Sequence, residues 1–154
     1  MKYSQCKCLY CQKPLDRNIE EFVQVKKRFA HSNCKYVRDK IHDYCSHTYG
    51  NLYFLTTIDK QINELVSEGM TLLGIYKTLV WWYDIHGGDI QKSHGSIRIV
   101  KSVYGEAMDF YALQENMKNK NLNITKENMY KETESYTIHP TPISKPKKIK
   151  LFEI

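Results

Sequence analysis

Two short pairs of metal-binding residues near the N-terminus constrain this chain more than any other feature of its sequence. Two residues separate Cys8 from Cys11, and after a gap of nineteen residues two more separate His31 from Cys34. Two such pairs, joined by a loop long enough for a hairpin, can enclose one tetrahedral zinc ion. We therefore predict one structural Zn²⁺ ion, because four protein ligands leave no coordination position for a reacting water molecule.

Other cysteines and histidines nearby leave alternatives to this ligand set. Cys6 lies two residues before Cys8 and competes with it, although a zinc knuckle needs two residues between its thiols. A second group, His42, Cys45 and His47, lies along one predicted helix without a fourth ligand. We expect Cys45 to pack in the core and the two histidines to be solvated.

Local patterns predict the elements that carry the four ligands. Residues 22–25 and 28–30 have strand character on either side of a two-lysine turn, which predicts a short hairpin. Ser32 can cap a helix that runs to about residue 47. The apolar residues of this helix recur at helical spacing and predict its buried face: Val37, Ile41, Tyr44 and Cys45.

This order of elements resembles the first half of a LIM module and, more broadly, a treble-clef zinc finger. In both, a knuckle supplies two cysteines, and the start of a helix supplies two further ligands after a hairpin. The residues that carry the resemblance are Cys8, Cys11, His31 and Cys34. A LIM module has a second zinc-binding half, for which this sequence has no complete ligand set. The resemblance therefore implies the treble-clef fold and not a LIM function.

Residues 51–117 are predicted to form a small helical domain. Thr57, Thr71 and Ser102 can each cap a helix, and residues 96–100 can form a short strand. Apolar residues recur at helical spacing after each cap, so three short helices can bury one another's faces. The start of this segment also resembles the opening helices of a helix-turn-helix, although no basic helix follows them.

The last part of the chain changes in character. An asparagine-rich stretch is followed by proline and lysine residues that oppose regular structure, and the chain ends in an apolar run. The predicted fold class is α+β, mainly α: a treble-clef zinc module (knuckle, β-hairpin, helix), a small helical domain and an extended tail. The predicted domains are residues 1–50, 51–117 and 118–154, the last a flexible Lys/Pro-rich tail.

Composition argues against a membrane protein, and the motifs of the sequence argue against an enzyme. The hydrophobic content is 42% and the charged content 26%, and no apolar run approaches the roughly 20 residues that span a bilayer. The first residues lack the apolar core of a signal peptide, so we expect a cytoplasmic location, where cysteines stay reduced and favour metal over disulfides. No phosphate-binding loop or nucleophile motif is present, so we expect no catalytic activity.

The positive charge lies in the predicted zinc module and the tail. Residues 1–50 contain ten basic and five acidic residues, residues 51–117 five and eight, and residues 118–154 eight and four, for a net charge of +6. Clustered basic residues are what a phosphate backbone attracts, whether of DNA or of RNA. The alternative is a solvated charged face. The predicted nucleic-acid contacts are Lys26, Lys27, Arg28, Lys35 and Arg38.

A protein partner is the second hypothesis. Three adjacent aromatic residues at 81–83 cannot all point inward from one helix, so we expect at least one to be exposed. Residues 148–152 resemble the short peptide with which bacterial proteins bind the DNA sliding clamp. The alternatives are a nonspecific hydrophobic end and a strand added to a neighbouring sheet. The predicted partner-binding residues are Trp81, Trp82, Ile149, Leu151 and Phe152.

Over most of its length the chain resembles small proteins encoded by phages and prophages of low-GC Gram-positive bacteria. The resemblance rests on residues 28–34, 74–83 and 96–107 and on the Lys/Pro tail. This family carries no settled activity. The hypothesis is a non-enzymatic, zinc-stabilised phage-type protein that acts on nucleic-acid transactions in the host cytoplasm, as a regulator or accessory factor. The alternative is an effector that binds a host protein, such as the sliding clamp, a polymerase or a defence component.

Overall fold

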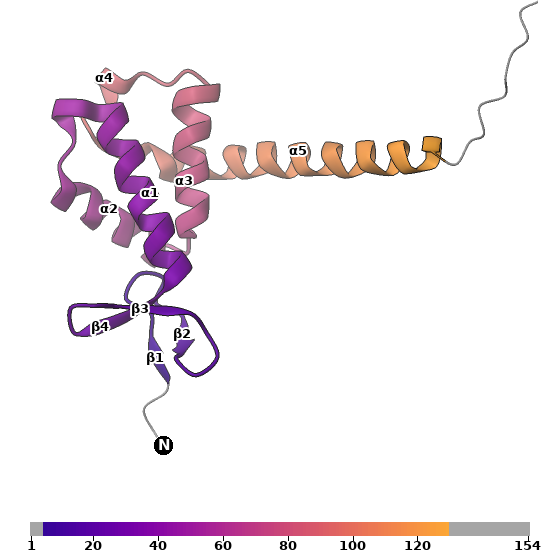
Figure 1. The fold of residues 1–154 in the computed structure, drawn as a ribbon. Coiled ribbons are helices and arrows are strands. Elements are labelled where there is room, and N and C mark those ends of the chain that lie inside the picture. Colours follow the sequence, from indigo (N-terminus) through magenta and orange to yellow (C-terminus); the bar gives the residue numbers. More distant parts are fainter. Residues whose placement is uncertain (1–4, 130–154) are drawn as a thin grey trace, which may run out of the picture. The chain divides into compact units, whose positions relative to one another are not determined.

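The computed structural model describes residues 5–129, which are mainly helical after two small N-terminal hairpins (Figure 1). The elements are β1 (Gln5–Lys7), β2 (Pro14–Asp16), β3 (Phe22–Val25), β4 (Arg28–His31), α1 (Ser32–Tyr49), the 3-10 turn η1 (Gly50–Leu52), α2 (Leu55–Ser67), α3 (Leu72–Val80), the π-helical turn η2 (Trp81–Ile85), α4 (Ile90–Ser93) and α5 (Ile99–Met129). This order confirms the predicted fold class.

Residues Met1–Met117 belong to one compact unit, and a second unit begins at Lys118. The division of the first unit into a zinc module and a helical domain stays a prediction. The predicted apolar C-terminal motif, Ile149, Leu151 and Phe152, lies outside the described residues. Within the described part of the chain, no helix is both long enough and apolar enough to cross a membrane.

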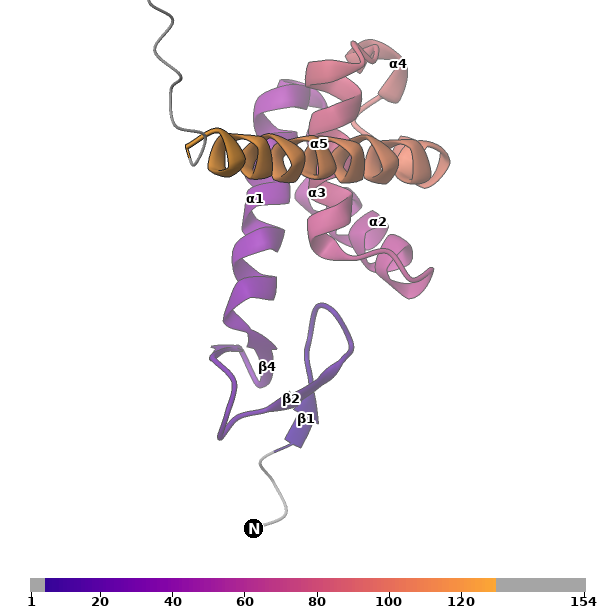
Figure 2. The ribbon, with the colours of Figure 1, turned by 90° about the vertical axis from the view of Figure 1, so that its right-hand side faces the viewer.

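Each hairpin is a pair of short antiparallel strands. In the first, Gln5 of β1 lies opposite Asp16 of β2, and this pair was not predicted. In the second, β3 and β4 pair so that Val25 lies opposite Arg28, which confirms the hairpin expected around the two lysines. Strand β4 runs directly into α1, as Figure 2 shows.

Helix α1 begins at the metal-binding sequence. The predicted cap, Ser32, is wrong: Ser32 is already helical, and the preceding His31 occupies the cap position without a capping side-chain hydrogen bond. The imidazole of His31 points at two sulfur atoms instead, and this use of its side chain explains the missing cap. Further along, Val37, Ile41 and Cys45 are buried as predicted, and Tyr44 packs partly against them.

Helices α2 and α3 form a tight helical hairpin. The amide N–H of Met70 donates to the carbonyl of Leu65, and that of Gly69 donates to Val66, which is the Schellman arrangement. Gly69 has a φ of +97°, so the predicted left-handed helix end is confirmed. Thr71 caps α3 as predicted, with its hydroxyl accepting from Gly74. Helix α2 begins at Leu55, two residues before the predicted cap at Thr57.

The aromatic run after α3 lies largely inside the protein. Trp81 and Tyr83 are 8% and 9% exposed and Trp82 is half-buried, so the expectation of an exposed aromatic is wrong. The π-helical turn explains the difference, because its wider spiral turns successive side chains toward two packing surfaces. Trp81 packs with Val103 and Ala107 of α5, whereas Tyr83 enters the core formed with α1.

The segment before α5 also differs from its prediction. Residues 96–100 do not form a strand, and α5 begins at Ile99 rather than after a cap at Ser102. The buried Ile97 explains this start, because its amide donates to the side-chain oxygen of Gln61 on α2. The helix then continues to Met129, past residue 117, where the sequence placed the end of the helical region.

Two glycines, one at the contact of α3 with α5 and one inside α5, predict opposite changes in stability when each is replaced by alanine. A Cβ at Gly74 would lie 2.2 Å from the Tyr104 hydroxyl oxygen and 2.7 Å from its ring, so Gly74→Ala should lower the free energy of unfolding by about 1–3 kcal/mol. A Cβ at Gly105, inside α5, would meet no heavy atom within 4 Å. Gly105→Ala should therefore raise the free energy of unfolding by roughly 0.5–1 kcal/mol.

Urea unfolding of both variants beside the wild type measures these changes. Equal stability of Gly74→Ala and the wild type would contradict the described packing of Tyr104 on α3.

Candidate metal centre and adjoining basic groove

Four side chains from two distant stretches converge on one point next to the hairpins. The ligand atoms of Cys8, Cys11, His31 and Cys34 all lie within 4.8 Å of one another. The Nδ1 atom of His31 is 3.4 Å from the Cys11 sulfur and 3.6 Å from the Cys34 sulfur. A tetrahedral zinc ion with ordinary bond lengths separates such ligand atoms by about 3.5–3.8 Å. The predicted ligand set is therefore confirmed as a group that can hold one metal ion, and its chemistry favours zinc.

Backbone hydrogen bonds hold the knuckle against the second hairpin. The Cys8 amide donates to the Lys13 carbonyl and the Gln12 amide to the Cys8 carbonyl, which closes the turn around the first ligand pair. The Leu9 amide donates to the carbonyl of Phe29 on β4, two residues before His31. One backbone hydrogen bond thus joins the knuckle to the strand that leads to the second ligand pair.

The thiols of the cluster differ in their pKa. Burial opposes ionisation of Cys8, but backbone N–H groups of Cys11, His31 and Tyr10 donate to its sulfur and lower its pKa to about 7. Burial and the neighbouring sulfurs raise the pKa of Cys34. Three thiolates this close together repel one another, so a bound cation is what stabilises their ionised form.

A carboxylate outside the ligand set positions the histidine. One oxygen of Glu20 lies 3.5 Å from His31 Nε2, on the side of the ring away from the sulfurs. The other Glu20 oxygen accepts from the backbone N–H of Asp16 at 2.7 Å. Such a carboxylate fixes the orientation of a metal-binding imidazole. Sequence reasoning missed Glu20, although the register of the predicted hairpin places it close to His31.

The alternative ligands do not join this cluster. Cys6 lies in β1 opposite Leu15, and it is absent from the one cluster of potential metal ligands found among residues 5–129. Cys45 is fully buried, and burial raises the pKa of its thiol to about 12. His47 is exposed as expected, whereas the expectation that His42 is solvated is wrong.

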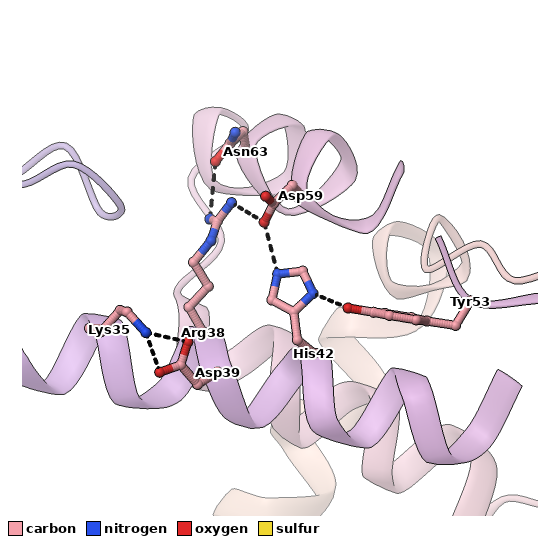
Figure 3. A network of polar contacts seen from close by, with 7 residues as sticks. All are labelled: Lys35, Arg38, Asp39, His42, Tyr53, Asp59 and Asn63. Carbon is pink, nitrogen blue, oxygen red and sulfur yellow. Dashed lines mark hydrogen bonds and ion pairs between the residues drawn. The ribbon is translucent and has the colours of Figure 1, made fainter. Parts of the chain in front are cut away.

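His42 belongs to a network that joins α1 to α2 (Figure 3). Its Nε2 lies 2.8 Å from an oxygen of Asp59, and its Nδ1 lies 2.9 Å from the Tyr53 hydroxyl. The same Asp59 oxygen accepts from the guanidinium of Arg38, which also donates to the side-chain oxygen of Asn63 at 3.2 Å. One carboxylate therefore satisfies two side chains of α1.

The five predicted nucleic-acid contacts separate into two groups. Residues 26–28 are exposed at and beside the β3–β4 turn. Lys35 is paired with Asp39 one helical turn away, at 2.5–2.7 Å. Arg38 is only 7% exposed, and its guanidinium lies over the Tyr10 ring at 4.7 Å. Arg38 is thus occupied by contacts within the protein.

A groove brings the exposed basic turn next to this network. It is lined by residues 26–28 from the hairpin, by Tyr10 and Gln12 from the knuckle, and by Arg38, Asp59 and Asn63 from α1 and α2. We call it the basic groove. Two of its lining residues, Gln12 and Lys26, have positive φ angles of 61° and 56°. Residues with a Cβ rarely adopt this backbone conformation, and where they do, it often marks a functional site.

Comparisons with known proteins give no further identification. No protein-family model matches the chain, and neither a curated protein nor a solved structure is significantly similar to it. The cluster, with a β-hairpin between its two ligand pairs and helix α1 at its end, is consistent with a zinc finger.

Replacing one ligand should remove the metal. We expect Cys34→Ser to lose stoichiometric zinc and the cooperative unfolding of the hairpins with α1, because binding energy at such a site is folding energy. Cys6→Ser is the matched control and should retain both, since Cys6 is outside the cluster. Elemental analysis and thermal unfolding measure the two properties. Unchanged zinc content in Cys34→Ser would show that the ligand set is different.

The role of Glu20 gives a separate prediction. Glu20→Ala should weaken zinc binding by about 10- to 100-fold, because His31 loses the carboxylate that orients its ring. The control is Glu21→Ala, which removes the same charge from the neighbouring exposed position. Competition with a chromogenic chelator measures the affinity. An equal loss in both variants would indicate a general charge effect rather than orientation of His31.

Proposed function

We propose that this is a zinc-stabilised binding protein that contacts nucleic acid through the basic groove, as a regulator or accessory factor. The zinc ion has a structural role in this proposal, because three sulfurs and one imidazole nitrogen complete a tetrahedral coordination sphere. The protein itself supplies phosphate contacts and no catalytic step.

The observation that carries the proposal is the conformation of Lys26. This residue occupies the first position of the two-residue turn between β3 and β4, with a φ of 56°. Glycine adopts this conformation without cost, whereas a residue with a Cβ loses roughly 1–2 kcal/mol. A lysine in this position is explained if its ammonium group, beside the ammonium of Lys27 and the guanidinium of Arg28, has a binding role.

The rest of the groove suits a nucleic acid. Polar side chains of Gln12 and Asn63 can reach sugar and base edges beside the phosphate-binding turn. The charge of Arg38 is offset by Asp59, so the exposed positive charge of the groove is concentrated at residues 26–28. Because Lys35 is paired with Asp39 and Arg38 with Asp59, neither residue belongs to the proposed phosphate contacts.

The alternative is a protein effector of phage origin that binds a host protein through the aromatic residues and the tail. Trp81 is buried, and the tail motif lies outside the described residues. No contact within residues 5–129 favours this alternative over the basic groove.

Lys26→Gly separates binding from folding. It should keep or raise the free energy of unfolding, by up to about 1 kcal/mol, because glycine relieves the turn. It should weaken binding to labelled DNA or RNA. The negative slope of log affinity against log salt should become shallower by about 0.7–0.9, the contribution of one phosphate contact. Fluorescence anisotropy across a salt series measures the binding, and urea unfolding measures the stability.

Lys92→Ala is the control for lost charge, since Lys92 is 86% exposed on α4, outside the basic groove. An equal effect of the two substitutions, or no salt-dependent binding by the wild type, would contradict the proposal.

A further inference from the structure

Helix α5 carries an apolar stripe that extends beyond its packing partners. Phe110, Leu113 and Met117 follow one another at spacings of three and four, which places them on one face. Val103, two helical turns before Phe110 on the same face, is buried against Trp81. Leu113 and Met117 are 57% and 56% exposed. The stripe therefore begins in a packed cluster and continues into solvent.

The sequence of this part of α5 does not favour a helix by itself. Residues 112–129 contain five asparagines, which are poor helix formers. A helical segment of this length is only marginally stable in water without packing on an apolar face. A partner on the stripe would supply the missing packing.

The charges along α5 indicate which partner fits. Residues 106–117 contain three acidic residues, Glu106, Asp109 and Glu115, and no basic residue. Residues 118–122 contain Lys118 and Lys120 and no acidic residue. A second copy of this helix in antiparallel orientation places each acidic segment beside the lysines of the other. A parallel copy places like charges together.

We propose that α5 is a self-association surface, on which two copies of the chain pair as antiparallel helices through Phe110, Leu113 and Met117. Such a pair is related by a twofold axis, so the same stripe is buried on both copies and the assembly closes as a dimer. The inference goes beyond the proposed nucleic-acid binding and does not depend on it.

Sedimentation equilibrium of the full-length, zinc-loaded protein over a concentration series tests the proposal. The wild type should form a dimer. Leu113→Glu with Met117→Glu should raise the dimer dissociation constant by at least about 100-fold, because both copies then place carboxylates in an apolar contact. The control is Leu55→Glu, which adds the same charge at a leucine of α2 that is 56% exposed. It should leave the dimer unchanged.

Lys118→Glu with Lys120→Glu tests the orientation. In an antiparallel pair these changes replace attraction by repulsion, and the dissociation constant should rise at least about tenfold at low salt. In a parallel pair like charges face each other before and after the change, so the constant should hardly move.

Three outcomes would overturn the proposal. A monomeric wild type would show that something other than a second copy covers the stripe. A dimer that survives the Leu113 and Met117 changes would place the contact elsewhere. A dimer indifferent to the lysine reversal would contradict the antiparallel arrangement. Zinc content and far-ultraviolet circular dichroism confirm that each variant is folded.

Discussion

Convergence of four ligand atoms on one metal position is the constraint on which the N-terminal part of this protein depends. Two-stranded hairpins of three or four residues per strand are not stable by themselves. Few of their residues are buried, and Leu15 and Ala30 are the fully buried apolar ones within the described strands. Because Cys8 and Cys11 precede the strands of the second hairpin and Cys34 lies in α1, coordination would join the knuckle to the first helix. A bound metal ion would thus substitute for a hydrophobic core that these residues are too few to build.

Polar contacts then connect this module to the helices. Arg38 of α1 stacks on Tyr10 of the knuckle and donates to Asp59 on α2, so one buried side chain connects its own helix with two other segments. Its position on α1, between the metal ligands and the apolar core, suits this role. Among the basic residues that line the groove, the exposed ones are residues 26–28, at and beside the β3–β4 turn. The same contacts therefore stabilise the protein and decide which basic residues can bind.

Two surfaces follow from this arrangement, and each rests on a local feature that folding alone does not explain. At the basic groove it is a lysine in a backbone conformation suited to glycine. On α5 it is a stripe of exposed apolar residues on an asparagine-rich helix. A nucleic acid and a second copy of the chain would contact different residues, so both proposals can hold together. Two copies would also present two basic grooves, which raises the effective affinity for a long nucleic acid.

The sequence by itself determined the ligand set, the β3–β4 hairpin, the buried face of α1 and the boundary between α2 and α3. Each depends on residue types within a few positions of one another, such as Gly69 after a helix or two ligands one turn apart. Only the tertiary structure decided that Arg38 is neutralised by Asp59, 21 residues away, and that Gln61 sets the start of α5 by binding Ile97, 36 residues away. It also decided that a π-helical turn buries Trp81 and Tyr83 on two different surfaces. These outcomes require partners that are distant along the chain, and spacing within a segment carries no information about which distant side chain will supply the matching charge, hydrogen bond or apolar surface.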